Sequence, residues 1–371
     1  MQKVKYKFRL YPSPGQLSAL AQVAGNCRFV WNHFLANEIS TYKNSKKFNF
    51  EYKNCKDLTV LKKTLSWLKL APSTALQTTL TNLNQSLTTF LKWKKTKSGP
   101  KRGFPRFKVK LNFKSSFTLT MVSTDRNIKN NKFYIPKIGN VECVFHRELP
   151  SDFSSCTIKQ EAGKWFVVLT VDKPKVQLPK TSNHVGIDLN SANIVCSDGT
   201  DIPIPKYLRE SQPRIKRLQR SLSRSKKGSK NRKKKQFRLA KLHWHVKQQR
   251  HDFAHKLSTS LIRKYDIISL EDLNVVGIQK FNGHIVKDNI FAIFRNMMEY
   301  KGLMYGRTVV IVDRWFPSSK TCNSCGVIKN DLKLNERIYV CEHCNHVEDR
   351  DLNAAKNIDD YGMSTVGHTG I

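Results

Sequence analysis

Two Cys-x-x-Cys pairs constrain the fold of this chain more strongly than any other feature. They are Cys322–Cys325 and Cys341–Cys344, and fifteen residues separate them. Each pair lets two thiolates converge on one side of a tight turn, so the two pairs together can hold one zinc ion in a tetrahedral site. Because four thiolates leave no open position for a substrate, we expect one structural Zn²⁺ that folds a short ribbon over 319–346. A redox motif would need only one of the two pairs.

The charge of the chain narrows the class of its partner. Its 371 residues include 66 Lys and Arg against 28 Asp and Glu, which gives a formal net charge of +38. An excess of this size predicts a polyanionic partner, above all a nucleic acid, because neutralising phosphates releases counterions. A solvated basic face and an anionic membrane are the weaker alternatives. No apolar run is long enough to span a membrane and no signal sequence is visible, so we expect a cytoplasmic, nucleoid-associated protein without a membrane partner.

Hydrophobic patterning divides the chain into four predicted parts. Alternating residues up to Tyr11 predict a strand, and apolar residues at spacings of three, four and seven predict helices after it. Short alternating stretches before Pro174 favour a small β-barrel, and Pro174 and Pro179 mark a linker after it. Beyond this linker, four apolar runs predict strands of an α/β domain: Val185–Leu189, Ile194–Cys196, Asp266–Leu270 and Thr308–Val312. The predicted parts are the barrel (1–14 and 97–178), a helical bundle (15–96), the α/β domain (179–318 and 347–371) and the zinc ribbon (319–346).

Two basic segments are the candidate contacts to nucleic acid. Residues 92–110 mix basic side chains with aromatics and glycines, which predicts an irregular loop. Residues 214–238 hold thirteen basic residues and no acidic one, and a turn at 225–228 predicts an antiparallel helical hairpin over 208–264. We expect these side chains to bind phosphates rather than to read bases. The candidates are Lys101, Arg102, Arg106, Lys108, Arg214, Arg217, Lys233, Lys234 and Lys235.

Three carboxylates accompany predicted elements of the α/β domain. Asp188 lies within the apolar strand 185–189, Glu271 ends the apolar strand 266–270, and Asp351 begins a helical run. A carboxylate in a buried strand is costly unless it is paired or binds a cation. Two Mg²⁺ ions, which prefer carboxylate ligands, would activate a water and stabilise the leaving oxygen in phosphodiester hydrolysis. The pattern therefore suggests a magnesium-dependent site.

Periodicity alone leaves alternatives open at this site. It does not choose between Glu271 and Asp272, or between Asp349 and Asp351. Each acid could instead be a helix cap, a surface charge or a hydrogen-bonded core residue.

Several motifs along the chain resemble the TnpB family, the transposon-encoded relatives of type V CRISPR effectors. The residues that carry this resemblance are Phe8-Arg9-Leu10-Tyr11-Pro12, Arg28-Phe29-Val30-Trp31-Asn32, Gly103-Phe104-Pro105-Arg106-Phe107-Lys108, Gly186-Ile187-Asp188-Leu189, Leu270-Glu271-Asp272-Leu273-Asn274-Val275, Asp313-Arg314-Trp315-Phe316-Pro317-Ser318-Ser319-Lys320-Thr321-Cys322, both cysteine pairs, and Asp349-Arg350-Asp351-Leu352-Asn353-Ala354-Ala355.

The resemblance implies an α/β RNase H-like (RuvC) nuclease domain with an inserted zinc ribbon and three catalytic acids at Asp188, Glu271 and Asp351. It thereby chooses between the neighbouring acids. It also implies an N-terminal lobe of a wedge-like β-barrel and a helical recognition bundle. This lobe would grip a guide RNA from the transposon end, which pairs with double-stranded target DNA beside a short motif. The chain departs from the family at Asn190, where many members have glycine.

The expected activity is that of an Mg-dependent RNA-guided DNA endonuclease associated with a prokaryotic insertion sequence. A cleavage-inactive, RNA-guided DNA-binding repressor is the first alternative; a missing acid would mark it, and none is missing. An accessory transposase protein is the second. His243-Trp244-His245 superficially fits a transposase His-x-His motif, but residues two apart on a helix point to different faces. The sequence does not indicate an oligomeric state.

Overall fold

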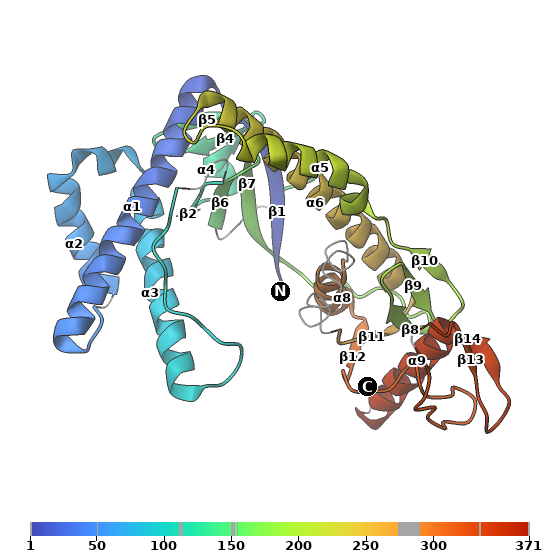
Figure 1. Ribbon diagram of the computed structural model, residues 1–371. Helices are drawn as coiled ribbons and strands as arrows, with labels where there is room; N and C mark the ends of the chain where they lie inside the picture. The colour runs from blue at the N-terminus through green and yellow to red at the C-terminus, as the bar shows by residue number, and fades with distance from the viewer. Residues whose placement is uncertain are drawn as a thin grey trace. The chain divides into compact units, whose positions relative to one another are not determined.

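The computed structural model describes residues 2–49, 51–110, 114–149, 153, 155–273, 290–333 and 335–369. The chain forms two compact units, Met1–Lys173 and Pro174–Ile371 (Figure 1). The division falls at the start of the predicted linker, where Pro174 and Pro179 interrupt the pattern. The finer division into four parts stays a prediction.

Unit 1 contains a seven-stranded antiparallel sheet in the order β2-β6-β7-β1-β5-β4-β3. The N-terminal strand β1 is central, because it pairs with β7 along most of its length and with β5 at its end. Its side chains alternate, so Phe8 and Leu10 are fully buried. Closure of this sheet into a barrel stays a prediction. The strands are β1 (Gln2–Tyr11), β2 (Ser116–Thr120), β3 (Ile128–Lys129), β4 (Lys132–Ile135), β5 (Gly139–Val144), β6 (Ser155–Glu161) and β7 (Lys164–Lys173).

Helices follow β1 as the sequence predicts. They are α1 (Pro14–Ser45), α2 (Glu51–Thr64), the short 3₁₀ helix η1 (Ser66–Leu70), α3 (Ser73–Thr96) and, within the sheet, α4 (Thr124–Asn127). Ser13 begins α1 with a capping box, because its hydroxyl accepts from Gln16 N–H while the Gln16 side chain accepts from Ser13 N–H. The predicted loop from residue 92 was wrong at its start, since α3 continues to Thr96.

The segment after α3 is irregular, yet its backbone is fixed on α1. The Trp31 indole N–H donates to the carbonyl of Arg106 at 3.0 Å. The Asn32 side chain donates to the carbonyl of Lys108 at 2.9 Å and accepts from its N–H at 2.7 Å. These side-chain bonds satisfy backbone groups of a segment that belongs to no helix or sheet.

Unit 2 contains a mixed five-stranded sheet in the order β10-β9-β8-β11-β12. Strands β9 and β10 continue antiparallel from β8 on one side, whereas β11 and β12 run parallel to β8 on the other. All four strands that the sequence predicts after Pro179 are present. The strands are β8 (His184–Leu189), β9 (Asn193–Cys196), β10 (Asp201–Pro203), β11 (Ile267–Glu271) and β12 (Thr308–Val312).

Two long helices, α5 (Tyr207–Ser223) and α6 (Lys230–Lys264), form the predicted antiparallel hairpin between β10 and β11 (Figure 1). Helix α8 (Phe291–Tyr305) packs against α6 and precedes β12. Strands β13 (Ile338–Val340) and β14 (Val347–Asp349) pair within the cysteine-containing segment. The final helix, α9 (Arg350–Thr369), lies against β8, β9, β11 and β12.

Two glycines let α9 approach the sheet closely. A Cβ atom on Gly186 of β8 would lie 2.1 Å from the Ala355 carbonyl oxygen and 2.3 Å from the Asp359 nitrogen, both backbone atoms of α9. A Cβ atom on Gly362 of α9 would lie 1.7 Å from the Ser269 hydroxyl oxygen of β11. Only glycine leaves room at these contacts, and they fix where α9 begins relative to the sheet.

Within the part of the chain that the structure describes, no helix has the length and apolar character needed to span a bilayer.

Candidate functional site

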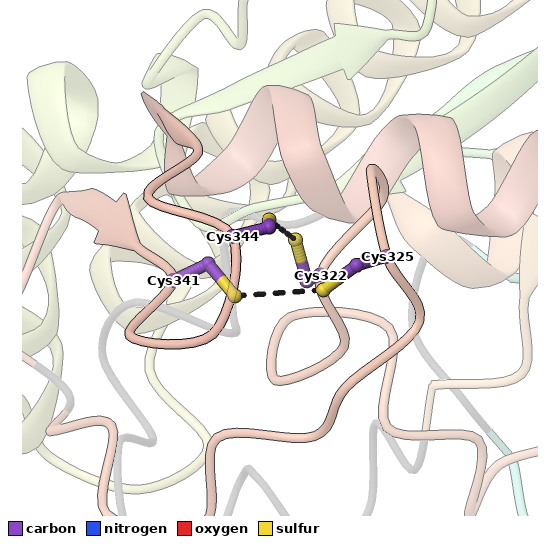
Figure 2. Close-up of side chains that lie close together, drawn as sticks. All are labelled: Cys322, Cys325, Cys341 and Cys344. Carbon is purple, nitrogen blue, oxygen red and sulfur yellow. Dashed lines mark hydrogen bonds between the residues drawn. The ribbon is translucent and has the colours of Figure 1, made fainter.

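The four cysteines of the two pairs converge, as the sequence predicts (Figure 2). Their sulfur atoms all lie within 4.8 Å of one another. Cys322 Sγ is 3.7 Å from Cys344 Sγ, and Cys325 Sγ is 3.6 Å from Cys341 Sγ. Sulfurs at about 2.3 Å from a tetrahedral zinc would be about 3.8 Å apart. The donor set and its spacing therefore fit one zinc ion with four thiolate ligands.

Local backbone bonds shape the two turns that present the thiols. Gly326 N–H donates to the Cys322 carbonyl at 2.8 Å, and Asn345 N–H donates to the Cys341 carbonyl at 3.0 Å. Gly326 and Asn345 both have positive φ angles, which these tight turns require. Amide groups of the second turn, first Cys344 N–H, stabilise the Cys341 thiolate and lower its pKa to about 6.

Buried asparagines of α9 attach the first cysteine turn to the helix. Asn353 accepts from Asn323 N–H at 3.0 Å and donates to the Thr321 carbonyl at 2.7 Å. Asn357, one turn later, donates to the carbonyls of Ser318 and Thr321 at 2.8 and 2.7 Å. Sequence reasoning missed these residues, although two asparagines four apart on one helix face were a signal.

The sheet register brings two of the predicted acids to one edge. Ile187 of β8 lies opposite Leu270 of the parallel strand β11, so the next residues, Asp188 and Glu271, lie at the same level, at or next to the carboxyl ends of the two strands. Asp351 lies in the first turn of α9, and that helix packs on both strands. The three predicted acids therefore come from two neighbouring strands and one helix start.

The electrostatics of Asp188 reflect this proximity. Asp188 is only 7% exposed. Its burial raises the pKa of its carboxyl well above the ordinary value, and the negative charges of Glu271 and Asp351 raise it further. Burial also raises the pKa of Glu271, and burial together with the nearby Asp349 raises that of Asp351. Asn190 donates to Asp188 Oδ2 at 2.7 Å and also bonds to Asp351. Its amide thus lies between two of the acids.

The carboxylates do not surround a single point. Among the described residues, the four cysteines are the only group in which three or more His, Cys, Asp or Glu ligand atoms gather within 4.8 Å. A pair of metal ions about 3.5 to 4 Å apart spreads its ligands over a wider space than one ion does. The described carboxylates could serve such a pair without meeting at one atom.

The neighbouring acids that the pattern could not exclude have other partners. Asp272 is paired with Arg295 and with Arg314, whose Nη2 lies 2.8 Å from Asp272 Oδ2. Asp349 Oδ1 accepts from the N–H groups of Asp351 and Leu352 at 2.9 and 3.0 Å, so Asp349 is the N-cap of α9. These pairings favour Glu271 and Asp351 over their neighbours as ligands. Asp351 has one loose ion pair, with the Arg337 guanidinium 3.9 Å from its Oδ2, and the assignment stays a prediction.

Ser318 holds the Glu271 carboxylate in place. Its hydroxyl donates to Glu271 Oε1 at 2.6 Å, and the residue is only 6% exposed. The Ser318 carbonyl in turn accepts from Asn357 of α9. Sequence reasoning did not assign this serine or Asn190 a positioning role.

The hairpin places several basic side chains around one open hollow. Residues of α5 spaced three or four apart share a helix face there, and Lys235 of α6 completes it. Sequence reasoning named Arg217 and Lys235 but missed the others. The lining residues are Pro213, Lys216, Arg217, Arg220, Ser221, Arg224 and Lys235.

Eight of the nine predicted phosphate contacts are exposed, and the ninth, Lys235, is partly buried. Lys235 already donates to the Ser221 carbonyl at 3.1 Å and to the Ser225 hydroxyl at 3.0 Å, so it also holds the hairpin turn. The Lys108 ammonium lies 3.7 Å from the centre of the Trp31 ring. Their contact with nucleic acid stays a prediction. The exposed candidates are Lys101, Arg102, Arg106, Lys108, Arg214, Arg217, Lys233 and Lys234.

Three family models match the chain. Residues 166–282 match the family described as "Probable transposase" (OrfB of IS605), and residues 291–358 match the "Cas12f1-like, TNB domain". Residues 1–47 match a "Helix-turn-helix domain", although the structure forms one strand and one long helix there.

Solved structures with similarity along the chain share little sequence with it. The Cas12f1–sgRNA–target DNA complex has 17% identity and a TM-score of 0.38, covering 97% of this chain and 99% of that one. CasPhi-2 bound to crRNA has 9% identity and a TM-score of 0.45, covering 98% of each chain.

Curated relatives are much more similar in sequence. A Streptomyces pristinaespiralis protein named as an RNA-guided DNA endonuclease is 34% identical over 370 residues, which span 96% of this chain and 89% of the relative. InsQ of Escherichia coli K12, named in the same way, is 27% identical over 95% of this chain and 90% of its own. The TnpB-like protein L79 of Acanthamoeba polyphaga mimivirus is 30% identical over 55% of this chain and 42% of its own. With such similarity over nearly its whole length, and with the IS605 OrfB match, the chain belongs to the TnpB family.

Proposed function

We propose that this chain is an RNA-guided DNA endonuclease in which Asp188, Glu271 and Asp351 bind two Mg²⁺ ions within an RNase H-like (RuvC) domain. The observation that carries the proposal is the shared register of Asp188 and Glu271 on adjacent parallel strands, with the start of α9 packed beside them. The mixed sheet order of unit 2 supports it. The names of the full-length relatives support the same activity.

The donor set fits magnesium. Three carboxylates that share a partly buried space repel one another, and a cation compensates their charge. Carboxylate oxygens are the ligands that Mg²⁺ prefers. Bound there, magnesium would supply an activated water and charge neutralisation at phosphorus.

The chain's own residues would position this chemistry. Ser318 fixes the orientation of the Glu271 carboxylate, and Asn190 holds the Asp188 carboxylate by one oxygen. Asp349 caps α9 and so places Asp351 at the helix start. Each ligand would thus be held before substrate arrives, which lowers the cost of reaching the reactive geometry.

The proposed partners are a guide RNA from the transposon end and double-stranded target DNA with a short adjacent motif. The net charge of +38 and the basic hollow on the α5–α6 hairpin support a large polyanionic partner. In this arrangement base pairing would select the target, while the protein would contact the duplex through phosphates. A structural Zn²⁺ at the four cysteines would stabilise the ribbon.

The test compares carboxylate variants in the purified ribonucleoprotein with its copurifying RNA. We expect the wild-type chain to cut a matched target in Mg²⁺, and Asp188→Asn, Glu271→Gln and Asp351→Asn to cut at least about a hundredfold more slowly. Asp349→Asn is the matched control, because asparagine caps a helix as well as aspartate does. Variants of the three acids that cut at the wild-type rate would refute the assignment.

Two alternatives have distinct outcomes in the same assay. A guided repressor would bind the matched DNA without nicking it at any Mg²⁺ concentration. An accessory transposase protein, which the name of the matching family suggests, would instead promote excision of transposon ends without a guide. Sequencing the RNA that copurifies with the chain identifies the guide and so separates the first alternative from the second.

A further inference from the structure

Trp315 is the most exposed large hydrophobic side chain among the residues that the structure describes. It is 85% exposed, whereas Phe316 beside it is partly buried. An exposed indole forgoes the free energy that its burial would contribute. The indole is therefore available for contact with a partner outside the fold.

The position of Trp315 relative to the proposed acids follows from the sheet. Val312, the last residue of β12, lies opposite Glu271 of the parallel strand β11. The residues that follow Val312 therefore leave the sheet at the edge where Asp188 and Glu271 lie. Trp315 is three residues beyond Val312, so its segment borders the proposed site.

The backbone around Trp315 is fixed on both sides. On one side, Arg314 Nη2 binds Asp272 Oδ2 at 2.8 Å and its Nε donates to the Asp272 carbonyl at 3.2 Å. On the other side, the Phe316 ring lies 5.0 Å from the Tyr361 ring of α9.

The turn itself is closed by Asp313. Its side chain accepts from Trp315 N–H at 2.8 Å, and its carbonyl accepts from Phe316 N–H at 3.1 Å. Two residues later, Ser318 binds Glu271. The indole is thus presented from an anchored turn next to the candidate ligands.

We propose that Trp315 stacks on a nucleobase of the DNA strand that is cut, and so holds an unpaired nucleotide beside the acids. This inference rests on the proposed function. Stacking suits a guided nuclease because every base offers a planar face, so the contact tolerates any target sequence. Arg314 is already paired with Asp272, which leaves the indole face as the group at this turn that is free to contact a base.

The first test pairs a protein change with a DNA change. Single-turnover cleavage by the guided ribonucleoprotein is measured on intact targets and on targets with one abasic nucleotide at each position around the cut. We expect Trp315→Ala to slow cleavage of the intact target by about 5- to 150-fold, and Trp315→Phe to retain most of the wild-type rate. At one abasic position the wild-type rate should fall to that of Trp315→Ala, and the variant should lose nothing further.

A matched control separates stacking from a general loss of apolar surface. Leu303 of α8 is 63% exposed, and Leu303→Ala should cut intact and abasic targets as the wild-type chain does. A Trp315→Ala chain that cuts the intact target at the wild-type rate overturns the proposal. So does a rate loss of the same size at every abasic position, or a loss of copurifying RNA in place of a cleavage defect.

A second measurement does not depend on cutting. Single-stranded DNA that contains 2-aminopurine is bound by the Asp188→Asn chain, and stacking on the indole should quench its fluorescence. Adding Trp315→Ala should abolish the quenching, and adding Leu303→Ala should preserve it; equal quenching in all three chains contradicts the proposal. Absence of wild-type cleavage would count against the proposed function, whereas this measurement decides the role of Trp315 separately.

Discussion

Ser318 and Asn190 orient the candidate acids, although each is chemically inconspicuous in the sequence. Ser318 contributes one hydroxyl to Glu271, and Asn190 contributes an amide between Asp188 and Asp351. The Asn190 side chain therefore provides a hydrogen-bond donor beside the proposed ligands.

Removing the Ser318 hydroxyl should weaken the proposed site without unfolding it. Ser318→Ala deletes the 2.6 Å bond to Glu271, and a hydrogen bond to a charged group contributes about 1.5 to 3 kcal/mol. We expect cleavage about tenfold slower or more, and a higher Mg²⁺ concentration for half-maximal rate. Titration of the rate with Mg²⁺ measures both effects.

Ser319→Ala is the matched control for this change. The hydroxyl of Ser319 makes no hydrogen bond to another of the described residues. If both variants showed the same Mg²⁺ dependence as the wild-type chain, Ser318 would not position Glu271.

At the scale of elements, helix α9 connects the cysteine cluster with the proposed magnesium site. Its first turn carries Asp351, its asparagines bind the first cysteine turn, and its glycine contacts hold it on the sheet. Displacement of this one helix would therefore disturb both the proposed magnesium site and the ribbon.

Gly186→Ala should displace α9. The new Cβ would overlap backbone atoms of Ala355 and Asp359, which cannot rotate away as a side chain would. We expect a loss of about 1 to 3 kcal/mol in the free energy of unfolding and a larger loss of cleavage than of RNA binding. Gly367→Ala, at an open position of the same helix, should be neutral or slightly stabilising. Urea unfolding and cleavage assays on the two variants would show whether the close contact matters.

Removal of zinc should act through the same helix. We expect one zinc ion per chain, lost on Cys325→Ser and retained on Cys55→Ser, as measured by metal analysis. Because Asn353 and Asn357 attach the first cysteine turn to α9, loss of the ion should also lower cleavage. A zinc-free Cys325→Ser chain with wild-type cleavage would separate the ribbon from the proposed site.

At the scale of the whole molecule, the excess positive charge predicts that the affinity for nucleic acid falls as the salt concentration rises. The α5–α6 hairpin alone carries thirteen basic residues and no acidic one over 214–238. Each phosphate contact adds about 0.9 to the slope of log K against log salt for duplex DNA, and about 0.7 for single strands. The chain as a whole should bind nucleic acid with a steep salt dependence.

The basic hollow should account for part of that slope. The triple change Arg217→Gln, Arg220→Gln and Arg224→Gln removes three lining cations, so the slope should fall by about 2 to 3. Lys256→Gln is the control, since Lys256 is paired with Asp252 at 2.8 Å on an exposed face of α6. Binding of the copurifying RNA at several salt concentrations gives the slopes. An unchanged slope in the triple variant would exclude the hollow as a phosphate site.

Local sequence patterns were sufficient to predict most strands and helices and the convergence of the four cysteines. Apolar runs such as Val185–Leu189 and Thr308–Val312 predicted their strands because buried parallel strands need apolar side chains on both faces. The two cysteine pairs predicted their own convergence because each pair forms its turn locally. The end of α3 at Thr96 was missed because lysines favour a helix as readily as they favour a loop.

The sequence by itself determined which residues could form strands, helices and a zinc site, since these depend on neighbours a few positions away. Only the tertiary structure decided which acids share an edge and which are already paired. The sequence does not distinguish Asp272 from Glu271 or Asp349 from Asp351. In the fold, two arginines pair with Asp272, and N–H groups at the start of α9 donate to Asp349. The physical reason is that strand register and the approach of α9 bring together residues more than eighty positions apart, and no local pattern records those contacts.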